Sequence, residues 1–143
     1  MKKALMGLAA VALTFILTGC GTETLTCTMS QSETGMKMDQ KAVITFEDNE
    51  VTNINMNVDV NVDETYSSYV DFMKSMLEEQ FKSYSDNGGK VNIDSENNKI
   101  SIKIDMDVKN MTDGQKKNLD LEDVYGTKDA TKKELESQGY TCK

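Results

Sequence analysis

The chain of 143 residues carries a formal net charge of −8 and contains no His, Trp or Pro. The absence of His removes the commonest general base and transition-metal ligand, and it excludes a Ser-His-Asp or Cys-His nucleophilic site within this chain. All basic residues are Lys, and an acidic chain without Arg lacks the basic surface that recognises nucleic acid. We therefore expect a protein that is not an enzyme and that does not bind nucleic acid.

The first twenty residues have the features of a bacterial lipoprotein export signal. Lys2 and Lys3 form a basic start, residues 4–17 are almost wholly apolar, and residues 17–20 read Leu-Thr-Gly-Cys. This order is that of a secretory signal peptide, and the apolar run is shorter than the roughly 20 residues that span a bilayer. The quartet resembles a lipobox, which implies diacylglycerol on the Cys20 sulfur and cleavage before Cys20. The alternative is an ordinary signal peptide that is cut nearby.

These features predict how the chain is divided and where it is located. We expect a signal peptide at residues 1–19, a lipidated N-terminus with a short tether at residues 20–23, and a single domain at residues 24–143. Stable anchoring needs about two lipid signals, which the two acyl chains of a diacylglyceryl group supply. The predicted location is the extracytoplasmic side of the cell membrane, with the lipid bilayer as the partner of acylated Cys20.

Two further cysteines remain, Cys27 and Cys142. An even number of cysteines in an exported protein favours a disulfide. Such a bond would tie the first predicted strand to the end of the chain. The alternative is a pair of free thiols.

Three segments in the first half of the exported chain alternate apolar and polar residues, which predicts half-buried β-strands. They cover residues 24–30, 36–47 and 51–62, and the third keeps its period of two although Asn and Asp are poor strand formers. A turn at residues 33–35 and a tight turn at Asp48-Asn49 join them. The predicted inward positions are Leu25, Cys27, Met29, Met36, Met38, Ala42, Ile44, Phe46, Ile54, Met56, Val58, Val60 and Val62.

Residues 64–86 change to the period of a helix. Asp63 or Thr65 can cap its start, and the sequence Asn87-Gly88-Gly89 can end it. Apolar residues recur at spacings of three and four, and polar residues fill the far side. The predicted core-facing stripe consists of Tyr66, Tyr69, Val70, Met73, Met76, Leu77, Phe81 and Tyr84.

The last third of the chain predicts two more strands, at residues 90–94 and 99–108, and a short helix from Thr127 or Asp129 to about Gln138. The polar residues 109–126 between them give no clear element. The other features expected here are a turn at Asn97-Asn98, apolar contacts from Leu119, Leu121, Val124 and Tyr125, a helix end at Gly139, and a return to the body at residues 140–142.

The order of these elements favours an α+β fold. We expect a two-layer sandwich with about five mainly antiparallel strands, and with one long helix and a short C-terminal helix on one face. Two helices cannot cover both faces of such a sheet, so the other face should be exposed.

The exposed face should carry the polar residues of the third strand. These are Asn53, Asn55, Asn57, Asp59 and Asn61, and they form either a plain solvated surface or a surface that a partner contacts.

Residues 59–63 begin like an EF-hand calcium loop, but Glu64 replaces the Gly at position 6 and Val70 replaces the bidentate Glu at position 12. We therefore do not expect an EF-hand. A weaker acidic site would use Asp59, Asp105 or Asp107.

The methionines suggest a further possibility, because thioethers can bind Cu(I) and residues 36–38 read Met-Lys-Met. Nearly every Met lies at a predicted core position, however, and core filling is the ordinary use of this side chain. The methionines concerned are Met29, Met36, Met38, Met56, Met73, Met76, Met106 and Met111.

With the lipobox, the strands around one long helix and the ending Lys-Glu-Leu-Glu-x-x-Gly-Tyr at residues 133–140, the chain resembles the YehR-like bacterial lipoproteins, a family of unknown function. The resemblance implies a two-layer α+β fold and supplies no catalytic residues. Two functions are then open. One is a non-enzymatic binding or interaction module whose partner is an envelope component or an extracellular molecule. The other is a carrier of a small ligand or of a calcium-type metal. We expect no cofactor, and we assign no residue as a metal ligand.

Overall fold

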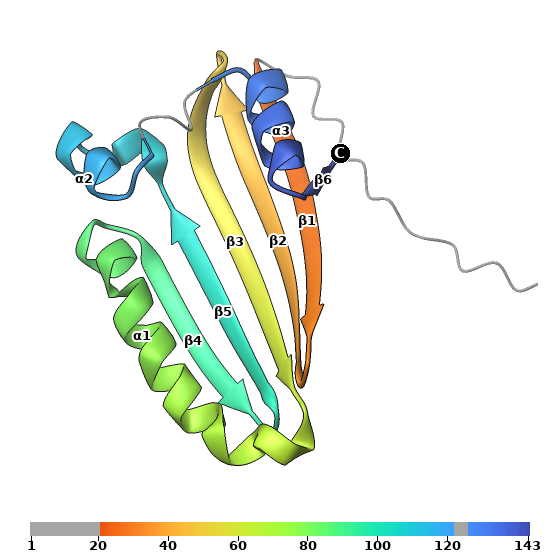
Figure 1. Ribbon diagram of the computed structural model, residues 1–143. Helices are drawn as coiled ribbons and strands as arrows, with labels where there is room; N and C mark the ends of the chain where they lie inside the picture. The colour runs from red at the N-terminus through yellow and green to blue at the C-terminus, as the bar shows by residue number, and fades with distance from the viewer. Residues whose placement is uncertain (1–20, 122–125) are drawn as a thin grey trace, which may run out of the picture.

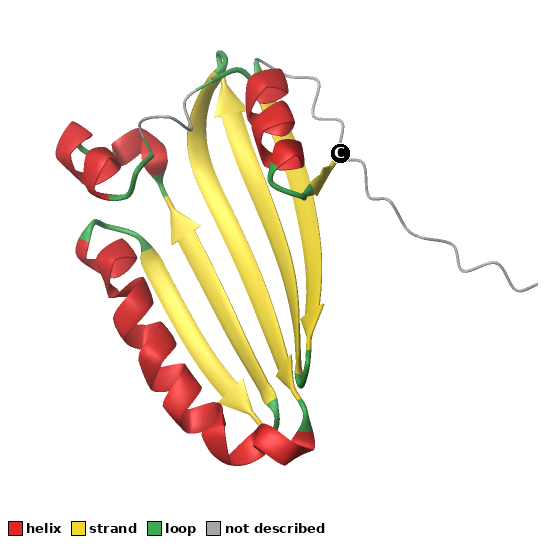
Figure 2. Cartoon of the chain, in the orientation of Figure 1, coloured by secondary structure: helices red, strands yellow, loops and turns green. Residues whose placement is uncertain are grey.

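The computed structural model describes residues 21–121 and 126–143, which form an α+β domain with one six-stranded antiparallel sheet (Figure 2). This confirms the predicted fold class, with one strand more than expected. No helix in the described ranges is long and apolar enough to cross a membrane. The strand order is β4-β5-β3-β2-β1-β6. The strands are β1 (Thr22–Glu33), β2 (Met36–Glu47), β3 (Glu50–Val62), β4 (Lys90–Glu96), β5 (Lys99–Met106) and β6 (Thr141–Cys142).

A helical crossover connects β3 to β4. The crossover consists of the short 3₁₀ helix η1 (Glu64–Tyr69) and of α1 (Val70–Asp86), and β5 lies between the two strands that it joins (Figure 1). Both β3 and β4 are antiparallel to β5, so they are parallel to each other. Two parallel strands need such a crossover because the chain must return to the end of the sheet at which the first strand began, which a tight turn cannot do.

One face of the sheet carries the hydrophobic core. Because side chains alternate along each strand, the paired residues Leu25, Ile44, Ile54 and Met106 form one apolar row across β1, β2, β3 and β5. All four are at most 5% exposed. Helix α1 packs on the β4–β5 side of this face, and the C-terminal helix packs on the β1–β6 side.

The predicted hairpin turns are confirmed. Asp48 and Asn49 adopt positive φ values of 50° and 66°, and Asn97 adopts 53°, as two-residue hairpins require. A bulge near Thr45 adds Thr52 to β3 as an extra residue. The bulge changes the alternation, so that Val51 also points into the core and is 4% exposed.

The polar segment after β5 contains two short helices that the sequence did not reveal. They are η2 (Val108–Asn110) and α2 (Asp113–Asn118), and a capping box between Thr112 and Gln115 starts the second. Leu119 and Leu121 are buried, as predicted. The expected contacts of Val124 and Tyr125 lie outside the described residues.

The C-terminal segment closes the sheet at β1. Helix α3 (Lys128–Ser137) begins with Thr127 as its cap, and β6 pairs Cys142 with Cys27 in an antiparallel bridge. A disulfide joins these two residues, which confirms the predicted bond. Thr22 and Glu23 already belong to β1, so the predicted tether is shorter than residues 20–23. Cys20 and the signal at residues 1–19 lie outside the described residues.

The predicted core-facing stripe of the long helix is partly wrong. Val70 is buried, and Met73, Leu77, Phe81 and Tyr84 pack against the core. In contrast, the other three residues assigned to the stripe are exposed: Tyr66 by 44%, Tyr69 by 58% and Met76 by 58%. Helix α1 lies over β4 and β5 near one side of the sheet, so the sheet covers a narrower strip of the helix than the apolar pattern suggests.

Candidate functional site

The polar row of β3 lies on the sheet face opposite the core, as predicted. Along this row Asn57 and Asn61 are exposed, whereas Asn53, Asn55 and Asp59 are half-buried by their neighbours. The strand is central, with β2 on one side and β5 on the other. The row is therefore the midline of the exposed face.

Charges on this face alternate in sign from one cross-strand row to the next. The acidic row places Asp39 of β2 opposite Asp59 of β3, with Ser101 and Asp94 further across. Rows that contain two lysines each lie on either side, Lys37 with Lys99 and Lys41 with Lys103. In strand geometry these rows are about 6.8 Å apart.

Two carboxylates in the acidic row are held in the charged form. Asp59 accepts a hydrogen bond of 2.7 Å from the Ser101 hydroxyl and lies 3.2 Å from the Lys99 ammonium. The hydrogen bond from the Ser101 hydroxyl holds the pKa of Asp59 below its ordinary value, and Lys99 lowers this pKa further. Burial acts in the opposite direction but is outweighed. Asp39 likewise has a lowered pKa, because the Ser30 hydroxyl at 2.6 Å and Lys37 at 2.9 Å bind its carboxylate.

These contacts explain how two like charges tolerate direct opposition, which is unfavourable by itself in a β-ladder. Asp39 and Asp59 each have a hydroxyl donor and a lysine. The amides beside them are also linked: Asn55 donates to Asn53 at 2.5 Å, and Asn53 donates to Asp105 at 3.0 Å. The face thus presents fixed, charge-compensated polar groups. A shallow hollow of about 560 Å³ lies in it, lined by Lys41, Asn57, Asp59, Asp94, Glu96, Lys99, Ser101, Ile102 and Lys103.

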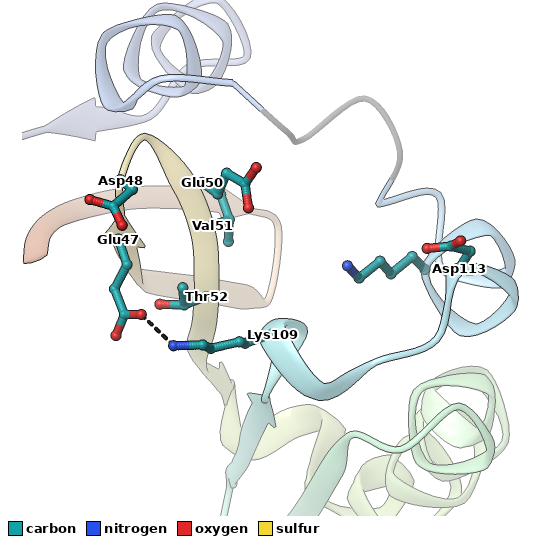
Figure 3. Close-up of a pocket in the computed structure, with 8 residues that line it drawn as sticks. Glu47, Asp48, Glu50, Val51, Thr52, Lys109 and Asp113 are labelled. Carbon is teal, nitrogen blue, oxygen red and sulfur yellow. Dashed lines mark hydrogen bonds and ion pairs between the residues drawn. The ribbon is translucent and has the colours of Figure 1, made fainter.

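A second hollow, also of about 560 Å³, lies at the end of the β2–β3 hairpin (Figure 3). Glu47, Asp48 and Glu50 come from the hairpin, and Asp113 of α2 lies across from them. Lys109 of η2 is 2.5 Å from Glu47, and this hydrogen bond raises the pKa of Lys109. Val51, Thr52 and Lys116 complete the lining.

Sequence reasoning missed this second hollow because its two sides are about sixty residues apart in the chain. The only signal was the acidic run of residues 47–50, which by itself indicates no more than a solvated turn. The hollow is lined mainly by charged groups, so a ligand there would be small and polar.

The structure does not gather the carboxylates that were considered as a metal site. Among residues 21–121 and 126–143, no group of three or more His, Cys, Asp or Glu side chains could hold a metal ion. Asp105 accepts a hydrogen bond from Asn53. Asp107, which caps the start of η2, accepts one from Asn110. Val70, at position 12 of the rejected calcium loop, is 4% exposed.

The methionines are likewise dispersed. Met106 and Met111 are buried, and Met38, Met56 and Met73 are partly buried against the core. Gln40 donates to the Met38 sulfur at 3.2 Å. Met36 and Met76 are the two large exposed ones in the described chain. Met29 is half-buried. Five of the eight methionines considered for Cu(I) therefore fill the core.

Comparison with known proteins supports the fold and adds no function. No family model matches the chain, and no curated protein matches it. An NMR structure of a protein from Streptococcus pneumoniae TIGR4 is similar over 100% of this chain and 97% of that chain, with a TM-score of 0.59 and 16% sequence identity. At that identity the likeness concerns the fold alone. The resemblance to YehR-like lipoproteins stays a prediction.

Proposed function

We propose that the protein is a lipid-anchored, non-enzymatic interaction module on the extracytoplasmic side of the bacterial membrane, and that its partner binds the exposed face of the sheet. The observation that carries this proposal is the fixed polar lattice on β2, β3 and β5. Its groups are spaced about 4.8 Å across the strands and about 6.8 Å along them. Hydrogen bonds and ion pairs between neighbours already orient these side chains, so a partner would lose little entropy in ordering them.

The electrostatics support binding rather than acid–base catalysis. A general acid that acts near neutral pH needs a raised carboxyl pKa. Asp39 and Asp59 have lowered values instead, so both are charged near neutral pH and suited to pairing with a cationic or hydrogen-bond-donating partner.

The anchor would lie at one end of this face. The Asp48 amide donates to the Gly21 carbonyl at 3.3 Å, which places the residue after Cys20 beside the β2–β3 hairpin. An acylated Cys20 would therefore bring the hairpin end of the sheet to the bilayer, and the strands would extend away from it. Mass spectrometry of the mature N-terminus tests the anchor, and an unmodified Cys20 would reject it.

A charge-altering variant tests the sheet face. In Asn55→Lys/Asn57→Lys/Asp59→Lys, three neighbouring polar groups of β3 are replaced, and capture of the native partner should be lost. The matched control Ser68→Lys/Ser75→Lys/Glu78→Lys adds the same charge at exposed positions of η1 and α1. Equal capture by both variants would show that the face is not the binding surface.

The hollow at the β2–β3 hairpin supports a second candidate, a carrier of a small polar ligand. Its volume of about 560 Å³ lies within the range of about 300–1,000 Å³ that is usual for ligand pockets. Thermal-shift measurements with calcium, other divalent ions and small charged metabolites distinguish the two functions. A shift that Glu50→Gln abolishes would favour the carrier, and the absence of any shift would favour the interaction module.

A further inference from the structure

The short helix η1 and the first half of α1 together expose an apolar stripe that neither the core nor the sheet face uses. We define the α1 stripe as Tyr66, Tyr69, Phe72 and Met76, which recur at spacings of three and four. Phe72 is 63% exposed, the largest exposed fraction among the large hydrophobic residues of the described chain. Single exposed apolar residues are ordinary, but a contiguous patch of large ones indicates an interaction site.

The helical geometry shows which flank the α1 stripe occupies. At about 100° per residue, Tyr69 and Met76 lie roughly a quarter turn from Leu77, which faces the sheet, and Phe72 lies further round, nearly opposite Val70. On the opposite flank, Glu78 and Ser85 line a hollow with Asn92 of edge strand β4. The stripe is therefore on the flank that is turned away from the sheet edge.

The stripe begins against the β1–β2 turn. A Cβ atom added to Gly35 would lie 2.4 Å from the Tyr66 ring, so the ring lies directly on the turn, and Met36 beside it is 38% exposed. This end of the sheet is opposite the end at which Gly21 contacts the β2–β3 hairpin. The 12 residues of β1 separate the two ends, which corresponds to about 40 Å.

The rim of the stripe is acidic. Lys74 and Lys82 are each engaged in an i,i+4 pair, with Glu78 and Asp86. Other carboxylates flank the stripe at both ends: Asp63 and Glu64 precede Tyr66, and Glu79 lies three residues after Met76. In the described part of the chain, none of these three carboxylates is within ion-pair distance of a lysine.

We propose that the α1 stripe docks a cationic amphipathic segment of another protein. Its apolar side chains would cover Tyr69, Phe72 and Met76, and its lysines or arginines would lie against the acidic rim. A second copy would bring the same acidic rim and a net charge of −8, so self-association is opposed by repulsion. An anionic lipid surface is opposed for the same reason. This surface is distinct from the sheet face, so its test does not depend on the proposed function.

The test uses residues 21–143, which contain the whole described core and the disulfide. The probe is an amphipathic helical peptide of Leu and Lys with about five turns, labelled for fluorescence anisotropy and measured at 0.15 M salt. We expect Phe72→Lys/Met76→Lys to weaken binding at least about tenfold, because two apolar contacts are lost and two repulsive charges are added. Both side chains are more than half exposed, so the variant should fold, which far-UV circular dichroism verifies.

A matched control separates docking from general attraction between opposite charges. Glu78→Gln/Ser85→Lys changes the charge of the same helix by the same amount on the other flank, where Glu78 and Ser85 line the hollow beside β4, and should change the affinity by less than about threefold. Equal weakening in both variants, or no binding by the native chain, would overturn the proposal. So would equal binding of a Leu and Glu peptide. Sedimentation that shows a native dimer, lost only in Phe72→Lys/Met76→Lys, would assign the stripe to a second copy instead.

Discussion

At the scale of single residues, the Ser101 hydroxyl determines how firmly Asp59 keeps its charge. We expect Ser101→Ala to raise the pKa of Asp59 toward its ordinary value, because the first cause of the lowered pKa is removed while burial and the opposing Asp39 charge remain. Carboxyl chemical shifts followed by NMR during an acid titration measure this directly. An Asp59 midpoint that is unchanged in Ser101→Ala would show that Lys99 alone is sufficient.

Asp39 provides the internal control for that measurement. Its hydroxyl donor is Ser30, so Ser101→Ala should leave its midpoint nearly unchanged, and Ser30→Ala should raise it. The sign of the effect on stability follows from linkage: a pKa lowered by folding stabilises the native state above the ordinary value of 3.8 and ceases to do so as the pH falls through the folded-state pKa. Either Ser→Ala variant should therefore lose less stability on acidification than the native chain.

At the scale of elements, the β1–β2 turn and η1 fit together at Gly35. This residue has φ of 82°, and an added Cβ would lie 2.4 Å from the Tyr66 ring. We expect Gly35→Ala to lower the free energy of unfolding by about 1–3 kcal/mol from the left-handed backbone alone, with the ring contact adding to it. Urea denaturation with the disulfide intact measures the change.

A double-mutant cycle separates the two causes. In the background of Tyr66→Ala, Gly35→Ala should cost less by about 1 kcal/mol, which is typical of the coupling between side chains in contact. Equal costs in both backgrounds would mean that the backbone conformation accounts for the whole effect and that the ring moves aside freely.

The elements also show what the sequence can and cannot predict. The period of two along β3 correctly placed its polar row, from Asn53 to Asn61 at every second residue, on the exposed face. A strand in a sheet has only two faces, and the apolar residues occupy the face that is packed on the core. The core-facing stripe of the long helix was predicted too wide. Apolar spacing shows which side of a helix is apolar, but it does not show how much of that side the sheet covers. Which part is covered depends on where β4 pairs, and β4 pairs with β5 rather than with β3.

At the scale of the whole molecule, the pairing of strands that are distant in sequence determines which segments become neighbours, and short-range patterns do not show this. The hollow at the β2–β3 hairpin exists because η2 and α2 follow β5, and β5 lies next to β3. No period or motif in residues 109–126 gives this neighbour. The disulfide was predictable for the opposite reason, because only two cysteines were left to pair within the predicted exported domain.

That disulfide supports the last prediction. It joins residues 115 apart in sequence, and in the chain-entropy model such a link stabilises the fold by about 4–5 kcal/mol through restriction of the unfolded chain. We expect Cys27→Ala/Cys142→Ala, in residues 21–143, to shift the urea midpoint downward by a corresponding amount with little change in slope. Dithiothreitol should leave this variant unchanged, because no disulfide remains to be reduced.

Hydrogen exchange distinguishes this global effect from a local one. Cys142 belongs to the two-residue strand β6, which packs against β1 and α3. If the bond served only to hold down the C-terminus, its loss would reduce amide protection in α3 and β6 while β2, β3 and β5 kept theirs and the midpoint stayed constant. Chain entropy requires that protection in the central strands also falls, because their slowest exchange occurs through global unfolding. Unaltered protection in β3 of the double variant would therefore contradict the expected loss of about 4–5 kcal/mol in the free energy of unfolding, because the chain-entropy effect acts on the whole chain.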